Sequence, residues 1–248
     1  MHSIFFLFVF LASLFIAAPP AFAEDECLQC HEELTQGKSV HAAVAMGCPT
    51  CHSAIDARTI PHKKKNKIGK GLSSEQPELC YGCHDQSRFT GKVVHAAVGK
   101  RCTGCHNPHA SKNAKLLTAE PPYLCFACHD KAAFTRRNVH APLAKGQCTS
   151  CHAPHASENA SLLERPLQRL CAECHAGKSD GKHILAGYGN NAPHPTRGRS
   201  DQLKQGKEFS CVSCHTPHSS NGKALLAVES TNSRDICLKC HTKIMVRP

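Results

Sequence analysis

Apolar residues form one continuous run near the start of the chain and only short clusters after it. The run extends from Ile4 to Ala18 and leads into Pro19-Pro20-Ala21-Phe22-Ala23, where Ala21 and Ala23 have the spacing of a small-residue cleavage site. The run is too short for a good membrane-spanning helix. Residues 1–23 are therefore expected to be a secretory signal peptide, and an uncleaved anchor is the alternative because the segment carries no Lys or Arg.

The remaining residues, 24–248, are expected to be the mature, exported chain and to contain little regular structure. Gly, Pro, Ser, Asn and Lys separate its apolar clusters, as in residues 61–67 and 187–206. Residues 114–117 and 160–163 can each form a helical turn, but turns of this length are unstable alone. The pattern predicts a mostly irregular fold with short α-helices and little or no β-structure.

Aromatic residues are scarce after residue 23. The whole chain has ten Phe, three Tyr and no Trp, and most of the Phe lie in the expected signal peptide. A domain of this size normally depends on aromatic side chains for much of its buried area. Another apolar component must therefore supply that surface, and without it the chain is expected to be unfolded.

The sequence Cys-x-x-Cys-His occurs nine times and uses all 18 cysteines. In this motif the two thiols can bond covalently to a haem and the adjacent His can bind its iron. The sequence thus predicts nine covalently attached haems c. The attaching residues are Cys27, Cys30, Cys48, Cys51, Cys80, Cys83, Cys102, Cys105, Cys125, Cys128, Cys148, Cys151, Cys171, Cys174, Cys211, Cys214, Cys237 and Cys240. The proximal iron ligands are His31, His52, His84, His106, His129, His152, His175, His215 and His241.

Other uses of Cys-x-x-Cys do not account for the His. A redox dithiol or a disulfide framework needs no His after the second Cys. Zinc sites would pair the motifs into four-ligand sets and leave one of nine without a partner.

The motifs are arranged in repeated double units. Residues 79–117 and 124–163 each hold two motifs, a Val-His between them and a Pro-His after the second. Residues 170–226 are a longer copy, residues 27–62 a degenerate first copy, and residues 236–241 a half-unit. An elongated, repeat-like array of four double-haem units and a half is expected.

This pattern resembles the doubled C-x-x-C-H family of multihaem cytochromes. The resemblance covers essentially all of residues 24–248, and it is greatest to periplasmic electron-transfer cytochromes of metal-respiring bacteria, including decahaem proteins associated with outer-membrane porins. It implies attachment of haem outside the cytoplasm. It also implies partners that are other redox proteins: a quinol-linked donor or periplasmic cytochrome, or a porin with an outer cytochrome. An alternative is that copies of the chain stack end to end into an extracellular haem filament, with the same electron-carrying chemistry.

The number of remaining histidines matches the number of second axial positions. Of 19 His, nine lie in motifs and His2 lies in the expected signal peptide. Nine are left as predicted distal ligands, and their pairing with individual motifs stays open at this stage. One of His183 and His194 is expected to serve the ninth haem. The predicted distal ligands are His41, His62, His95, His109, His140, His155, His183, His194 and His218.

The formal charge of +11 does not indicate nucleic-acid binding once the haems are counted. Each ferric haem adds two propionates and the one positive charge of its core, so nine ferric haems add about −9 and bring the net charge to about +2. Full reduction removes the core charges, so the haems then add about −18 and bring the net charge to about −7. The basic residues are better explained as partners of propionates.

Two functions remain open. With both axial positions filled by His, the haems only carry electrons, and the protein is not an enzyme. A reductase of nitrite, hydroxylamine or a sulfur oxyanion would need at least one haem with an open position. All nine motifs end in His, which favours the electron conduit.

Overall fold

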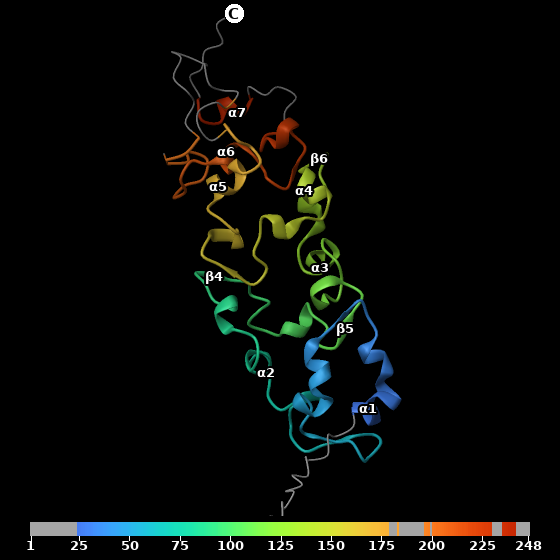
Figure 1. Ribbon diagram of the computed structural model, residues 1–248. Helices are drawn as coiled ribbons and strands as arrows, with labels where there is room; N and C mark the ends of the chain where they lie inside the picture. Colours follow the sequence, from blue (N-terminus) through green and yellow to red (C-terminus); the bar gives the residue numbers. More distant parts are fainter. Residues whose placement is uncertain (1–23, 179–182, 184–195, 199, 230–234, 242–248) are drawn as a thin grey trace, which may run out of the picture.

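The computed structural model describes residues 24–178, 183, 196–198, 200–229 and 235–241. These residues form an elongated array whose chain runs from one end to the other (Figure 1). Regular structure is limited to short helices and two-residue strands, as the sequence predicts. The expected signal peptide, residues 1–23, lies outside the described residues.

The helices are one to two turns long. The α-helices are α1 Glu24–His31, α2 Glu78–Tyr81, α3 Tyr123–Phe126, α4 Ala141–Ala144, α5 Leu167–Ala172, α6 Cys211–Cys214 and α7 Asp235–Leu238. The 3₁₀ helices are η1 Glu32–Thr35, η2 Ala42–Met46, η3 Cys48–Thr50, η4 Gly69–Gly71, η5 Gln86–Phe89, η6 Cys102–Gly104, η7 Ala114–Leu116, η8 Lys131–Phe134, η9 Cys148–Ser150, η10 Ala160–Leu162 and η11 Lys223–Leu225. Helices this short need fixed surroundings to persist.

Four antiparallel pairs of strands join these segments. Three of them connect residues from different sequence repeats: β1 with β5, β4 with β7, and β6 with β8. The fourth, β2 with β3, is a hairpin within the first repeat. The strands are β1 Ser39–Val40, β2 Ile55–Asp56, β3 Lys63–Lys64, β4 Val93–Val94, β5 Ala110–Ser111, β6 Asn138–Val139, β7 Ala156–Ser157 and β8 Ser219–Ser220.

The part of the chain that the structure describes has almost no apolar core of its own. Among the described residues, the only buried hydrophobic side chains are Ala54 and Ala110. A folded domain normally buries many large apolar side chains. The shape of the array is therefore not maintained by side-chain packing alone, in agreement with the scarcity of aromatic residues in the sequence.

Candidate functional site: nine motifs and their facing histidines

Every Cys-x-x-Cys-His motif begins in a helical turn. In eight motifs the backbone N–H of the His donates to the carbonyl of the first Cys over 2.8–3.1 Å, from His52 to Cys48 through His241 to Cys237. The remaining motif lies within α1. Residues three and four positions apart share one face of a helix, so both thiols and the imidazole of each motif can approach the same group. None of the 18 cysteines forms a disulfide, so both thiols of each motif remain for attachment of a cofactor.

The first cysteines of the two motifs in a unit lie side by side. Cys80 hydrogen-bonds to Cys102, and burial is the main cause that raises the pKa of the Cys80 thiol to about 12. Cys125 and Cys148 form the same contact, and burial raises the pKa of Cys125 to about 11. The same hydrogen bond joins the first cysteines of the first and fourth units, Cys27 with Cys48 and Cys171 with Cys211. The two attachment points in each double unit are therefore adjacent.

Attachment points of consecutive units are also close. Cys51 interacts electrostatically with Cys80, and Cys105 with Cys125. The later junctions repeat this, with Cys151 near Cys174 and Cys214 near Cys237 and Cys240. The cysteine pairs therefore continue from unit to unit along the array.

Eight of the nine motif histidines face one of the predicted distal histidines. Their ring centroids are 5.8–6.1 Å apart in every pair. The pairs, with the motif His first, are His31–His62, His52–His109, His84–His41, His106–His155, His129–His95, His152–His218, His175–His140 and His215–His183.

This spacing fits two imidazoles on opposite sides of one iron. A metal–imidazole bond is about 2 Å long and the ring centre lies about 1 Å beyond the nitrogen, so two axial rings should be about 6 Å apart. The motif cysteines and the scarcity of buried apolar side chains fit the same group. The residues present are therefore suited to hold haem.

The ninth motif ends at His241, whose backbone N–H donates to the carbonyl of Cys237 as in the other motifs. His194, the predicted distal ligand left after the other eight pairs, lies outside the described residues. His183 faces His215 of its own unit. If one histidine of this enlarged unit serves the ninth motif, it is His194.

Most pairs join histidines of neighbouring units. The Val-His of one unit faces the first motif of the next unit, as in His41 with His84 and His95 with His129. The Pro-His of the next unit faces back to the second motif, as in His109 with His52. Each junction between the first four units therefore contributes one histidine in each direction. Among the pairs in the described residues, His31–His62 and His215–His183 form within one unit.

The strand pairs between repeats produce this exchange. Val40 pairs with Ala110, and directly beside them the N–H of His41 donates to the carbonyl of His109 over 2.8 Å. The same backbone bond joins His95 to His155 and His140 to His218, over 2.8 and 2.9 Å. Each short ladder thus fixes two distal histidines from different units at once.

In the second motif of each unit, a backbone carbonyl fixes the motif histidine. The Nδ1 atoms of His52, His106, His152 and His215 lie 2.8–2.9 Å from the carbonyl oxygens of Lys70, Lys115, Ser161 and Ala224. A carbonyl only accepts, so Nδ1 carries the hydrogen and donates it, which leaves the lone pair on Nε2 for a metal.

The four residues that provide these carbonyls have a left-handed backbone. Their φ angles are 51–59°, although none of them is Gly. This conformation costs an L-residue roughly 1–2 kcal/mol. This backbone conformation turns each carbonyl toward the imidazole of a motif histidine. The backbone strain therefore occurs where a motif histidine is held in its orientation.

In the other pairs the distal histidine is fixed in the same way. The Nδ1 atoms of His41, His95 and His62 lie 2.8–2.9 Å from the carbonyls of Pro108, Pro154 and Thr59, and His140 hydrogen-bonds to the Pro217 backbone. Each of the eight pairs therefore contains at least one imidazole that is hydrogen-bonded to the backbone.

Aromatic rings hold two of the other distal histidines. Phe89 lies 4.9 Å from His155, and Phe134 lies 4.8 Å from His218, measured between ring centroids. Tyr81 and Phe126 pack behind these Phe rings at 5.6 and 5.5 Å. Burial lowers the pKa of His155 and His218, which favours the neutral imidazole that binds metals.

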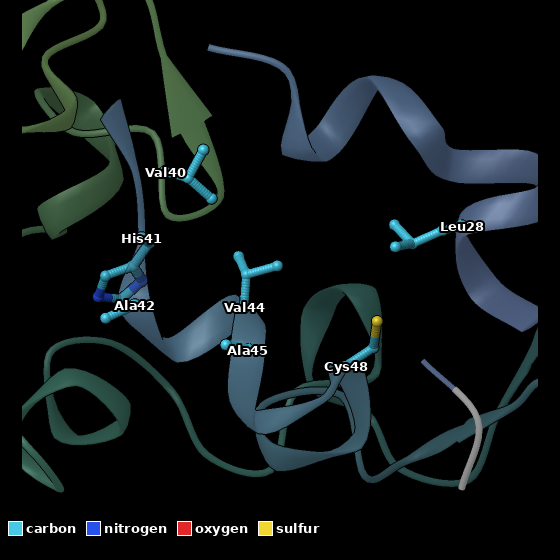
Figure 2. A pocket seen from close by; sticks show the side chains of 7 residues that line it. All are labelled: Leu28, Val40, His41, Ala42, Val44, Ala45 and Cys48. Carbon is cyan, nitrogen blue, oxygen red and sulfur yellow. The ribbon is translucent and has the colours of Figure 1, made fainter. Parts of the chain in front are cut away.

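An apolar cavity adjoins the second motif. It measures about 300 Å³ and is lined by Leu28, Val40, His41, Ala42, Val44, Ala45 and Cys48. In Figure 2 the Cys48 side chain and the Val44 and Leu28 side chains border the same space. Such a lining suits the apolar face of a porphyrin attached at Cys48.

The orienting residues were not identified from the sequence. Lys70, Lys115, Ser161 and Ala224 act through their carbonyls, so their side chains carry no signal. The available sign was positional: in three of them a Leu-Leu pair follows at the same distance from a Pro-His. Phe89 and Phe134 were also missed; the sign that could have found them is their equivalent position in two aligned repeats.

Within the described part of the chain, no helix has both the length and the apolar character needed to cross a bilayer. A comparison with curated proteins gave no match. The sequence does match the family defined by the doubled CXXCH motif, in four segments: residues 41–89, 95–134, 140–180 and 202–246. Each matched segment contains two Cys-x-x-Cys-His motifs. Since these segments cover most of the sequence and repeat the haem-attachment chemistry, the chain belongs to the doubled CXXCH motif family and is a multihaem c-type cytochrome of electron transfer.

Proposed function

We propose that this protein is an electron conduit with nine bis-histidine haems c, and that it is not an enzyme. The main support for the proposal is that eight motif histidines each face a further histidine, with 5.8–6.1 Å between the ring centroids. The ninth haem is assigned from the remaining motif at Cys237 and the two remaining histidines, His241 and His194.

The polypeptide's part in this function is to close both axial positions. Haem iron supplies a one-electron change between its ferric and ferrous forms, and a substrate binds it only where an axial position is open. In the eight described pairs, the motif His and the imidazole facing it would both hold the iron and would leave no position for a substrate. The residues thus support electron transfer and leave no metal site for substrate chemistry in the eight pairs described.

Orientation of the ligands also affects the redox potential. A hydrogen bond from Nδ1–H to a carbonyl makes the imidazole a stronger donor to iron and fixes its rotation. His52, His106, His152 and His215 have this bond on the motif side, and His41, His62 and His95 on the distal side. Bis-His ligation also favours a lower potential than ligation by Met and His. We expect uniformly low-spin, low-potential haems.

Continuity of the attachment points supports movement of electrons along the whole array. Within each unit the first cysteines of the two motifs are in contact, and between units the cysteines of neighbouring motifs are close. Thiols this close place neighbouring cofactors next to each other.

The cellular setting follows from the expected signal peptide at residues 1–23 and from the extracytoplasmic attachment of c-type haem. We place the protein in the periplasm, with the cell surface as the other exported location, in anaerobic respiration or extracellular electron transfer. Its partners are other redox proteins, with a quinol-linked donor or periplasmic cytochrome on one side and a porin-bound outer cytochrome as a further acceptor.

The test is a spectroscopic count on the purified holoprotein. Quantitation of haem after denaturation is expected to give nine per chain. Electron paramagnetic resonance of the oxidised protein is expected to show low-spin signals alone, and the reduced protein should bind no carbon monoxide. A high-spin signal together with carbon monoxide binding by the wild-type protein would reveal an open haem and overturn the conduit in favour of a reductase.

A further inference from the structure

The hairpin of the first repeat is strongly basic. We define the basic hairpin as residues 55–70, which contain one acidic residue, Asp56, and six basic residues: Arg58, Lys63, Lys64, Lys65, Lys67 and Lys70. All six basic residues are exposed. Among the described residues, this segment makes a single ion pair, in which Arg58 Nε lies 3.3 Å from Asp56 Oδ1. Most of its positive charge therefore faces solvent without a carboxylate partner.

The basic hairpin is an ordered structure. Ile55 pairs with Lys64 and Asp56 with Lys63 in β2 and β3. The N–H of Lys65 donates to the carbonyl of Ala54 over 2.8 Å, and the Asn66 side chain donates to the carbonyl of Leu72 over 2.7 Å. The lysines are thus presented on a fixed surface.

Gly71 allows this hairpin to close tightly against the chain. Its φ is 63°, and a Cβ added there would collide with the Ile55 side chain. Both conditions favour Gly.

The hairpin also carries an axial ligand. His62 lies in the turn between β2 and β3, and its ring is 6.1 Å from that of His31. Its Nδ1 is fixed by the carbonyl of Thr59 at 2.8 Å. Both His31 and His62 are exposed. The ligands of the first haem therefore lie at the surface. His62 is followed directly by the lysines of the hairpin, whereas His31 is followed by Glu32 and Glu33 and its Nδ1 lies 3.9 Å from Glu33 Oε1.

The tip of the hairpin exposes a large apolar side chain beside the cations. Ile60, two residues before His62, is 85% exposed, the highest value among the large hydrophobic residues exposed on the described chain. A small apolar contact surrounded by charge is typical of transient protein interfaces. In Figure 1 this cyan segment lies at the end of the array opposite the label C.

From these observations we infer that the basic hairpin is the docking surface for an acidic redox protein, which exchanges electrons with the haem held by His31 and His62. The inference rests on the proposed function. One electron passes between the partner's cofactor and this iron, so one is oxidised and the other reduced by one electron, without transfer of a proton. Complementary charge accelerates such encounters by 10- to 10³-fold at low salt, in typical cases.

A protein partner accounts for more of these features than an anionic membrane does. Lysines and an exposed Ile also suit a lipid surface, but binding to lipid does not explain why His62 lies in the same turn. The coincidence of charge, apolar contact and His62 on one hairpin favours a partner that exchanges electrons there.

The experiment uses the full holoprotein and reduced flavodoxin, a small acidic flavoprotein, as the electron-donating probe. Its hydroquinone becomes the semiquinone as one ferric haem becomes ferrous. Stopped-flow absorbance measures the second-order rate constant at about 0.01 M and about 0.3 M salt, where the Debye length falls from about 30 Å to below 10 Å. The test variant is Lys63→Gln/Lys64→Gln/Lys65→Gln. The matched control is Lys100→Gln/Lys112→Gln/Lys145→Gln, three exposed lysines elsewhere on the array.

The hairpin variant is expected to lose about tenfold in rate constant at low salt and to approach the wild-type value at high salt. The control variant should stay within about twofold of wild type. Equal losses in both variants, or no loss in the hairpin variant, would overturn the inference.

Two further measurements distinguish partner docking from propionate binding and from lipid binding. If the lysines mainly bind propionates, the hairpin variant will show a shifted midpoint potential in one haem. If they bind lipid, wild type but not the variant will sediment with phosphatidylcholine–phosphatidylglycerol vesicles while the flavodoxin rates stay equal. Either result would overturn the docking inference. Haem counts and low-spin spectra of the same samples test the proposed function separately, since they do not depend on flavodoxin.

Discussion

At the scale of single residues, orientation of the ligands depends on backbone atoms that no side-chain pattern reveals. Lys115, Ser161 and Ala224 differ in size and charge, yet each has a left-handed φ and turns its carbonyl to the Nδ1 of a motif histidine. The conformation serves the ligand, because a right-handed residue at the same position would direct its carbonyl elsewhere. The residue type at each of these positions is then restricted only by how well it adopts a positive φ.

Ser161 offers a direct test of this restriction. Its side chain is exposed and its φ is 57°. Ser161→Gly is expected to stay within about 1 kcal/mol of the wild-type stability, because relief of strain offsets the added freedom of the unfolded chain. Ser161→Val should be less stable than the Gly variant by about 1–2 kcal/mol, since a β-branched residue is poorly accommodated at positive φ. Thermal unfolding of the two variants measures the difference, and a Val variant as stable as the Gly variant would contradict the explanation.

The Phe rings provide a second test at this scale. Phe134→Leu removes the ring that contacts His218 and is expected to loosen the bond between His218 and the iron bound at His152. The reduced variant should then bind carbon monoxide at up to one equivalent per chain, whereas wild type binds none. The control is Tyr123→Leu, since Tyr123 is 72% exposed. Equal carbon monoxide binding by both variants would show that Phe134 does not position the ligand.

At the scale of elements, two-residue strands carry the connection between repeats. The pairing of β4 with β7 places His95 beside His155, although the two rings face different motifs: His129 for His95 and His106 for His155. Such short strands are unstable in isolation. In this array each strand pair between repeats is extended by a backbone hydrogen bond between two histidines of neighbouring units, such as the one from His95 N–H to the His155 carbonyl.

Exchange of ligands between units leads to a specific expectation for His95. Removing it by His95→Ala should open the haem of the following unit, so the reduced protein binds one equivalent of carbon monoxide. When the Cys125/Cys128 attachment site is also removed by Cys125→Ala/Cys128→Ala, that binding should disappear. When the site in the same unit as His95 is removed instead, by Cys80→Ala/Cys83→Ala, the single equivalent should remain. The reverse outcome would place His95 on its own unit's haem and contradict the exchange.

At the scale of the whole molecule, we expect the covalently bound haems to stabilise the array. Ala54 and Ala110 are the buried hydrophobic residues of the described chain, and side chains such as Met46 and Val40 are 62% and 49% exposed. Apolar area buried by the polypeptide alone is therefore too small to offset the conformational entropy of ordering the chain. Haem attachment and folding should be a single coupled process.

The haem-free chain is consequently expected to be unfolded. Residues 24–248 produced without haem attachment, under reducing conditions, should show a random-coil circular dichroism spectrum and be digested rapidly by trypsin. The holoprotein should resist digestion over the same period. A cooperative thermal transition in the haem-free chain would contradict this expectation, because it would require a core that the described residues do not contain.

Local chemistry could be predicted from the sequence because it depends on neighbouring residues. Two thiols and an imidazole three and four positions apart form a haem-attachment motif wherever the chain turns, so nine motifs and nine remaining histidines were apparent without coordinates. The mostly irregular fold was predictable for a similar reason: Gly, Pro and Lys interrupt every apolar cluster, and the short turns at Ala114 and Ala160 are present in the structure.

Only the tertiary structure decided which histidine faces which motif. His109 follows the motif of His106 by three residues, yet it faces His52 of the preceding unit. That choice depends on the pairing of β1 with β5, which brings residues 39–40 against residues 110–111. Pairing between segments so far apart is a property of the assembled array and its cofactors. No contiguous pattern encodes it, and for the same reason the carbonyls that orient the imidazoles became apparent only in three dimensions.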